Sequence, residues 1–179
     1  MINTKRIIAI IPARKNSKRL KNKNLLKINR KPLIYWSIQA ALNSKYIDKV
    51  VLSTESKEIA KIGEKLGANV PFLRPKKFAT DSSMTEDLII FTLNKLNKKE
   101  NYDIFILLQP TSPLRTSLSI DKSIEMLESK TGIYSVIGMV ENDLKINWCK
   151  LINNSGFIEN LVNTKLKNIL KKNYKINGA

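Results

Sequence analysis

The chain has 179 residues, of which 42% are hydrophobic and 26% are charged, a composition that excludes a disordered or fibrous protein and fits one globular domain. It contains no histidine and a single cysteine, Cys149, which excludes Ser-His-Asp or Cys-His catalysis, a Cys/His zinc cluster and an intramolecular disulfide. The formal net charge of +17 suits a nucleic acid, an anionic membrane or an acidic small molecule, so the distribution of the charge must choose among them.

The first predicted element is a buried parallel strand over residues 7–11, an isoleucine-rich run that Pro12 ends. A cationic loop follows, and no acidic residue precedes Asp48. Open α/β sheets bind anionic ligands at the carboxyl ends of their strands, so this loop predicts a polyphosphate site. A solvated basic loop is the alternative. The loop combines cations with amides and a hydroxyl: Arg14, Lys15, Asn16, Ser17, Lys18, Arg19, Lys21, Asn22, Lys23 and Asn24.

The next elements continue a β-α-β-α progression. Apolar spacing predicts a helix over residues 33–44, and a second buried strand over 50–52. Ser53 or Thr54 is then expected to cap a helix that Gly67 closes in a left-handed conformation. Short right-handed connections between such elements predict a parallel sheet.

Residues 69–75 are predicted to be extended, because they contain two prolines. The spacing Ser83-x-x-Glu86 is typical of a capping box, which we favour over a catalytic role for these two residues. Local structure does not explain Arg74 or the polar run over residues 80–85. The helix after the box has three apolar residues on one face, Ile89, Leu93 and Leu96.

Another apolar strand is predicted over residues 103–108. It leads into a proline-rich turn, 109–115, at the same sheet edge as the basic loop. In purely local terms this is a tight turn before a helix over 117–127, capped by Ser117 or Ser119.

The last part of the chain has a different pattern. A strand is predicted over residues 133–140, followed by a hairpin with its turn at 153–156. Residues 161–172 are weakly amphipathic and basic.

Two motifs resemble those of one family. Residues 12–24, Pro-Ala-Arg-x-x-Ser-Lys-x-Leu-x-x-Lys-Asn, are similar to the nucleotide-binding signature of the N-acylneuraminate cytidylyltransferases, or CMP-sialic acid synthetases. Residues 107–115, Leu-Leu-Gln-Pro-Thr-Ser-Pro-Leu-Arg, are the strongest match. The chain departs from the family at Arg19, where glycine is usual, and at Lys21, where proline is common. Enzymes that activate the eight-carbon sugar KDO carry Ser-Thr-Arg-Leu-Pro-Gly-Lys-Pro in the first motif, so the difference favours a nine-carbon sugar.

The resemblance implies a Rossmann-like, three-layer α/β nucleotidyltransferase fold with a mostly parallel sheet and a dimerisation arm. On this pattern residues 1–140 form the nucleotide-binding core and 141–172 the arm, which would make the protein a homodimer. Residues 173–179 would begin a strand that returns to the core, with the remainder of the domain missing. We therefore expect a C-terminally truncated member of the family.

The implied reaction transfers CMP from CTP to a sialic-type acidic sugar and releases pyrophosphate, for activated-sugar and cell-surface polysaccharide biosynthesis. The expected catalytic residues are Lys23 and Arg14, which neutralise developing charge. Gln109 and Lys145 are expected to bind the sugar, although Lys145 is equally well explained as a solvated side chain, and Arg115 as a salt-bridge or helix-start residue. The implied nucleotide-binding residues are Arg14, Asn16, Ser17, Lys18, Asn24, Arg74 and Thr85.

Magnesium is the expected cofactor because the triphosphate needs charge neutralisation, but the sequence identifies no ligand for it; Asp81 is one candidate carboxylate that we do not assign. No apolar segment approaches the roughly 20 residues of a membrane span, and one cysteine fits a reducing compartment. We expect a cytoplasmic protein without a nucleic-acid or membrane partner. Two alternatives stay open, a basic nucleic-acid-binding domain and an inactive nucleotide-sugar-binding protein. Sialic, legionaminic and pseudaminic acids are not distinguished.

Overall fold

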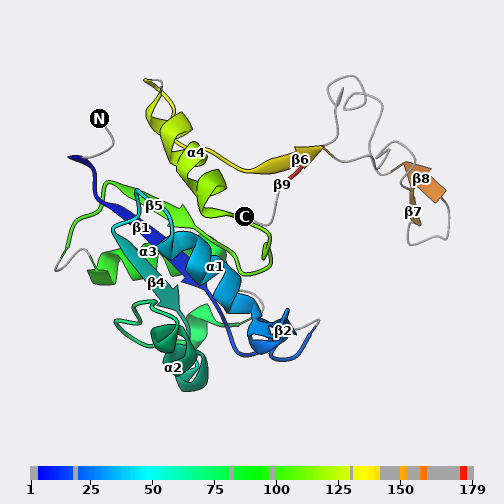
Figure 1. Ribbon diagram of the computed structural model, residues 1–179. Helices are drawn as coiled ribbons and strands as arrows, with labels where there is room; N and C mark the ends of the chain where they lie inside the picture. The colour runs from blue at the N-terminus through cyan, green and yellow to red at the C-terminus, as the bar shows by residue number, and fades with distance from the viewer. Residues whose placement is uncertain are drawn as a thin grey trace. The chain divides into compact units, whose positions relative to one another are not determined.

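The structure of the protein is a computed structural model that describes the following residues: 4–17, 20–80, 83–96, 100–129, 131–141, 150–152, 158–160 and 174–176. The chain divides into two compact units, the first ending at Val136 and the second beginning at Ile137. The first unit contains a parallel sheet with helices packed on it (Figure 1).

The central strand of this sheet is β1 (Ile7–Pro12), which pairs in parallel with β4 (Lys49–Ser53) on one side and β5 (Ile104–Leu107) on the other. Both pairings are parallel, which confirms the predicted parallel sheet, and the strand order is β4-β1-β5. All five residues from Ile7 to Ile11 are fully buried, as the unbroken apolar run predicted. Each buried isoleucine side chain contributes about 1.5–3 kcal/mol by leaving water.

Helices cover both faces of the sheet, which gives the three layers that the resemblance implied. They are α1 (Leu33–Leu42), α2 (Lys57–Lys65), α3 (Thr85–Leu96) and α4 (Ser117–Glu128). Successive side chains of β1 point to opposite faces. Its odd-numbered residues therefore join a core built with α1, α2 and α4, whereas Ile8 and Ile10 join a second core with Leu96 of α3.

Several short elements lie between these. A single turn of 3-10 helix, η2 (Lys23–Leu25), precedes a tight hairpin of β2 (Lys27–Ile28) and β3 (Lys31–Pro32). A second such turn, η3 (Lys76–Phe78), lies ahead of α3.

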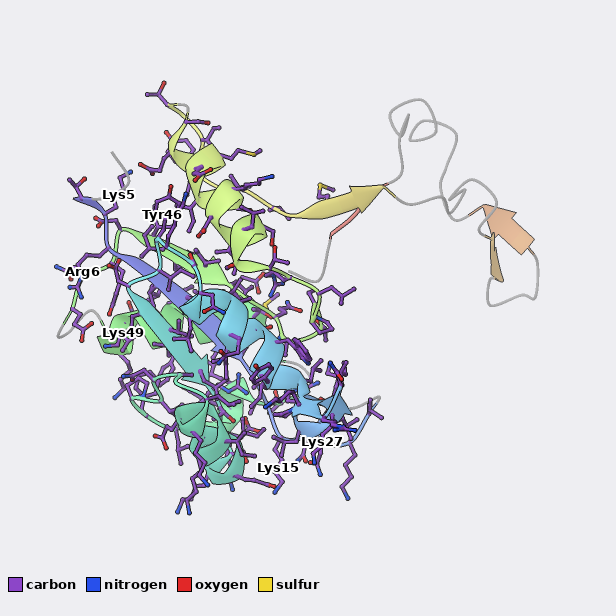
Figure 2. All side chains as sticks on the ribbon, viewed as in Figure 1. Lys5, Arg6, Lys15, Lys27, Tyr46 and Lys49 are labelled. Carbon is purple, nitrogen blue, oxygen red and sulfur yellow. The ribbon has the colours of Figure 1, made fainter. Side chains whose placement is uncertain are left out.

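Positive charge is found at both ends of the sheet. Figure 2 shows Lys5, Arg6 and Lys49 near the start of the strands and Lys15 and Lys27 near the other end. The net charge of +17 is therefore not confined to one ligand site, and much of it belongs to solvated surface.

The structure corrects the predicted starts of α2 and α4. Ser53 still belongs to β4 and Thr54 is fully buried, so α2 begins later, where Ser56 accepts a hydrogen bond from the Ile59 backbone N–H. Its predicted end is confirmed, because Gly67 has a φ of +94°. Helix α4 is capped by Thr116, not by Ser117 or Ser119.

The predicted capping box at Ser83 is wrong. Helix α3 begins at Thr85, so Ser83 lies one residue too early to cap it. Its hydroxyl instead accepts from the Thr80 backbone N–H at 3.1 Å and donates to the Lys77 carbonyl at 2.7 Å. The local loop competes successfully for this hydroxyl.

The second unit contains short antiparallel pairs. Strand β6 (Met139–Glu141) pairs with β9 (Tyr174–Ile176), and β7 (Lys150–Ile152) pairs with β8 (Ile158–Asn160). The second pair fits the predicted hairpin, whose turn lies outside the described residues. The strand predicted over 133–140 is mostly wrong, because only its end is a strand and Tyr134 is 94% exposed. Most of the predicted arm, namely residues 142–149, 153–157 and 161–172, lies outside the described residues.

Candidate active site

A cavity of about 280 Å³ lies at the carboxyl ends of β1 and β5, within the first unit. The strand order places it at a topological switch point, because the chain continues from β1 to one neighbour and later crosses to the other. Its size fits a small-molecule site. The lining residues are Pro12, Arg14, Ser17, Lys23, Asn24, Arg74, Phe78, Thr80, Ser83, Met84, Thr85, Leu88, Gln109, Pro110 and Thr111.

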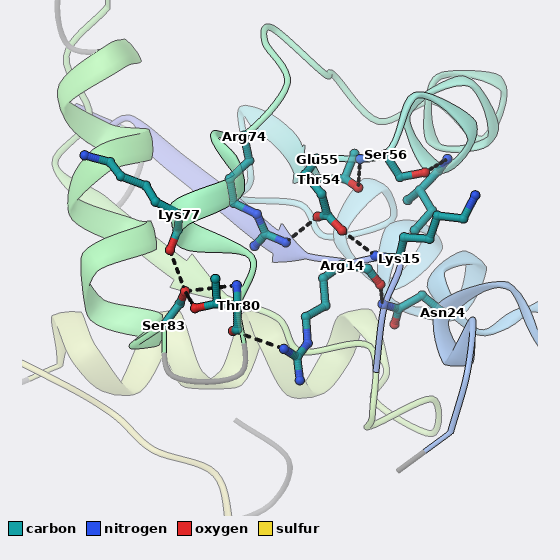
Figure 3. Close-up of polar contacts among 11 residues, drawn as sticks. Arg14, Lys15, Asn24, Thr54, Glu55, Ser56, Arg74, Lys77, Thr80 and Ser83 are labelled. Carbon is teal, nitrogen blue, oxygen red and sulfur yellow. Dashed lines mark hydrogen bonds and ion pairs between the residues drawn. The ribbon is translucent and has the colours of Figure 1, made fainter. Parts of the chain in front are cut away.

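The basic loop enters the cavity through Arg14. The Arg14 carbonyl accepts a hydrogen bond from Asn24 Nδ2 at 2.9 Å, and the following N–H, that of Lys15, donates to Glu55 Oε1 at 2.7 Å (Figure 3). The Arg14 guanidinium donates from Nη1 to the Thr80 carbonyl at 3.1 Å. Arg14 therefore joins the loop after β1 to the segment before α3.

Arg74 is the most buried cation of the cavity, with 5% of its surface exposed. Its backbone N–H donates to the Thr54 carbonyl at 2.8 Å, and its Nη2 donates to Glu55 Oε2 at 2.9 Å. Burying a charge is costly unless it is paired, and Glu55 supplies the pairing. The Nε–H is also buried and finds no hydrogen-bond partner in the described part of the chain.

Hydroxyl groups and an apolar wall complete this side of the cavity. The Thr80 and Ser83 hydroxyls lie 2.6 Å apart, and Thr85 is the first residue of α3. Phe78, Met84 and Leu88 add apolar surface. Polar groups beside an apolar wall suit a planar base better than a phosphate.

The turn after β5 presents Gln109 to the cavity. The backbone carbonyl of Gln109 accepts a hydrogen bond from Arg115 Nη1 at 3.3 Å and one from the Ser37 hydroxyl at 3.4 Å. Burial lowers the pKa of Arg115 from its ordinary value. Arg115 therefore holds the backbone of the turn.

The cavity brings together most of the residues that the sequence singled out, although they come from distant segments. Asn16 is exposed and does not line it. Lys18, Asp81 and Lys145 lie outside the described residues. The predicted residues that do line it are Arg14, Ser17, Lys23, Asn24, Arg74, Thr85 and Gln109.

Sequence reasoning missed the apolar wall and Glu55. The hydroxyl residues Ser53 and Thr54 indicate a helix start, and this interpretation assigns no role to the neighbouring Glu55. A signal was present, because an acidic residue directly after a buried strand reaches the edge where the basic loop lies.

The described residues do not form a magnesium site by themselves. None of the described cavity-lining residues is a carboxylate, and the described part of the chain contains no group of three or more His, Cys, Asp or Glu placed to hold a metal. Protein-bound Mg²⁺ prefers carboxylate and phosphate oxygens, so no catalytic step is assigned to an ion.

Over the same described ranges, no helix combines the length and the apolar character needed to cross a membrane. The cavity itself combines cations, hydroxyls and an apolar wall. This set can neutralise a polyphosphate while it holds a base, which is what a phosphoryl-group transfer requires of a protein.

Comparison with known proteins agrees with this chemistry. A family model described as "Cytidylyltransferase" matches residues 8–173. The CMP-N,N'-diacetyllegionaminic acid synthase of Legionella pneumophila is 41% identical over 97% of this chain and 76% of its own length. An N-acylneuraminate cytidylyltransferase of Escherichia coli is 38% identical over 77% of this chain and 32% of its own. A pseudaminic acid cytidylyltransferase of Campylobacter jejuni is 39% identical over 60% of this chain and 47% of its own length.

Solved structures support the fold alone, because their sequence identities are low. A CMP:2-keto-3-deoxy-manno-octonic acid synthetase complexed with CTP matches 76% of this chain and 51% of its own, with a TM-score of 0.61 and 20% identity. A 4-diphosphocytidyl-2C-methyl-D-erythritol synthase from Anaerococcus prevotii matches 96% of this chain and 68% of its own, with a TM-score of 0.60 and 16% identity. The chain thus spans only part of the length of these proteins.

Proposed function

Because this chain belongs to the cytidylyltransferase family, we propose that it transfers CMP from CTP to an acidic nine-carbon sugar and releases pyrophosphate. The observation that carries the proposal is the convergence of Arg14, Lys23 and Arg74 on one cavity with an apolar wall. Three cations suit a triphosphate, and the wall suits a base.

The reaction is an in-line displacement. The anomeric hydroxyl of the sugar attacks the α-phosphorus of CTP, the bond from that phosphorus to the β-phosphate oxygen breaks, and pyrophosphate leaves as the hydroxyl proton passes to water. Arg14, Ser17 and Lys23 bind the phosphates, with Lys23 at the α-phosphoryl group. Charge that develops in the transition state is then neutralised by groups already in place, and removing one such contact costs on the order of 2–4 kcal/mol.

The two remaining parts of the cavity receive the base and the sugar. Arg74 and Thr85, beside Phe78, hold the cytosine and ribose, since a base is discriminated by fixed hydrogen-bonding groups rather than by charge. Gln109 contacts the sugar acid. It follows β5, which lies on the other side of the central strand β1 from β4.

The sugar is proposed to be a legionaminic, sialic or pseudaminic acid. N,N'-diacetyllegionaminic acid is the first to test, because the legionaminic acid synthase matches almost the whole of this chain. Activity is expected to need Mg²⁺, since the triphosphate carries more negative charge than the described cations neutralise alone, and chelation with EDTA followed by readdition tests this. We place the reaction in the cytoplasm, where CTP is made. We also expect a homodimer, which light scattering coupled to size-exclusion chromatography would detect.

The main experiment measures pyrophosphate release from CTP with each of the three sugars, and CTP binding by calorimetry in parallel. We expect release with one sugar, and CTP bound more tightly than UTP, ATP or GTP. Arg14→Ala should weaken CTP binding, whereas Lys61→Ala, an exposed cation on α2, should not. Binding that ignores the base, is matched by RNA and falls steeply with salt would instead support the nucleic-acid-binding alternative. Selective CTP binding without turnover would support an inactive nucleotide-sugar-binding protein.

A further inference from the structure

One peptide group of the basic loop is held at both of its polar ends by side chains from other segments. Its carbonyl, of Arg14, accepts from Asn24, and its N–H, of Lys15, donates to Glu55. A peptide group is planar, so holding both ends fixes the direction in which the chain leaves this point. The Arg14 side chain starts from the atom adjacent to this peptide, so the clamp, formed by these two hydrogen bonds, holds the point from which the side chain enters the cavity.

The same carboxylate holds a second cation of the cavity. Glu55 uses Oε1 for the Lys15 N–H and Oε2 for Arg74 Nη2, so one side chain connects the loop after β1 with the segment ahead of η3 (Figure 3). The pair is well shielded, with 3% of the Arg74 side chain and 16% of the Glu55 side chain exposed. Charge-assisted hydrogen bonds at such sites are short and directional.

We propose that Glu55 is a positioning residue, which sets Arg14 and Arg74 at the spacing that CTP requires without touching the nucleotide itself. The inference rests on the proposed function, because it assumes that CTP occupies this cavity. Glu55 does not itself line the cavity. Of its two partners, Arg74 lines the cavity, and Lys15 directly follows Arg14, which also lines it.

A neighbouring ion pair supplies a matched control. Lys15 Nζ also contacts Glu58 Oε2 at 3.2 Å, but here 48% and 54% of the two side chains are exposed. Solvent screening makes such a surface pair weak, and it holds the tip of a flexible side chain instead of the backbone. Glu58→Gln therefore makes the same chemical change three residues away, in the first turn of α2, at a place where no positioning is expected.

The first measurement is CTP binding by calorimetry for wild type, Glu55→Gln and Glu58→Gln. The glutamine keeps an oxygen for the Lys15 N–H but removes the charge that pairs with Arg74. We expect Glu55→Gln to weaken CTP binding on the order of tenfold and Glu58→Gln to change it less than about twofold. If Glu55→Gln does not fold, Glu55→Asp, which retains the charge but withdraws it by one methylene, is expected to show a smaller loss in the same direction.

A double-mutant cycle with Arg74→Ala separates positioning from general destabilisation, because Glu55→Gln removes the charge that pairs with Arg74. If Glu55 acts through Arg74, the double variant loses less CTP affinity than the product of the single losses. The KM for CTP should rise in Glu55→Gln while the KM for the sugar stays within about twofold, a split that partial unfolding would not produce. Equal CTP binding by folded Glu55→Gln and wild type, or purely multiplicative losses in the cycle, overturns the inference. Failure of the wild type to bind CTP instead overturns the proposed function.

Discussion

Asn24 donates its side-chain amide to the backbone carbonyl of Arg14 across 2.9 Å, and only 5% of the asparagine is exposed. Asn24, which the resemblance assigned to the nucleotide, therefore also shapes the basic loop.

Asn24→Asp should weaken CTP binding by about tenfold or more. The new carboxylate has no N–H to donate, so the hydrogen bond to the Arg14 carbonyl is lost, and it adds negative charge beside a triphosphate. Calorimetric titration with CTP measures the loss. Asn43→Asp makes the same substitution at an exposed position after α1 and should bind CTP like the wild type. Unchanged CTP binding by Asn24→Asp would mean that the basic loop does not contribute to the CTP site.

Gly63→Ala should destabilise the protein by about 1 kcal/mol. A Cβ at Gly63 would overlap Leu52 Cδ2, which is fully buried on β4. Overpacking of about 1–3 kcal/mol outweighs the gain of about 1 kcal/mol in helix propensity. Urea denaturation measures the difference, and Gly138→Ala, where a Cβ meets no atom of the described residues within 4 Å, is the control. A more stable Gly63→Ala protein would mean that Leu52 moves aside freely.

The acid dependence of stability should include a contribution from Glu100. Its carboxylate accepts from Lys49 Nζ at 2.8 Å and from the Tyr102 hydroxyl, and these hydrogen bonds, that of Lys49 first, lower the pKa of Glu100 below its ordinary value. The ionised Glu100 therefore stabilises the fold above the unfolded-state pKa, and this stabilisation disappears as the pH falls through the lower folded-state pKa.

Denaturation of wild type and Glu100→Gln across pH 3–7 tests this. We expect the wild type to be more stable near pH 7 and the difference to shrink toward pH 3. Glu64→Gln, at an exposed position of α2, should show no such pH-dependent difference. A constant gap between wild type and Glu100→Gln would contradict the assignment.

The corrected cap of α4 gives a fourth prediction. Thr116 Oγ1 accepts from the Ser119 backbone N–H at 3.2 Å, so Thr116→Ala should cost about 1 kcal/mol of stability. Ser117→Ala, at the position where the sequence suggested a cap, should cost less than about 0.5 kcal/mol. Thermal or urea unfolding ranks the two variants, and a larger loss for Ser117→Ala would restore the original assignment.

The sequence predicted the central part of this molecule well because the signals there are local. Five consecutive apolar residues ended by Pro12 specify a buried parallel strand, and Gly67 has the left-handed conformation that its place after a helix indicated. Family membership was evident from two motifs, one on each side of the switch point. Local signals failed where several hydroxyls competed, as at Ser53, Ser83 and Ser117, since any of them can cap a helix and only the packed helix selects one.

By itself, then, the sequence determined that the sheet is parallel, how the main strands and helices follow one another along the chain, and the family, because periodicity and short motifs do not depend on distant contacts. The tertiary structure decided how the cavity is supported. The pairing of Glu55 with Arg74 spans nineteen positions, and the clamp on the Arg14 peptide unites residues from three segments. Such contacts depend on the burial of charges that come together only when the strands pair, and burial is a property of the folded chain, not of any segment within it.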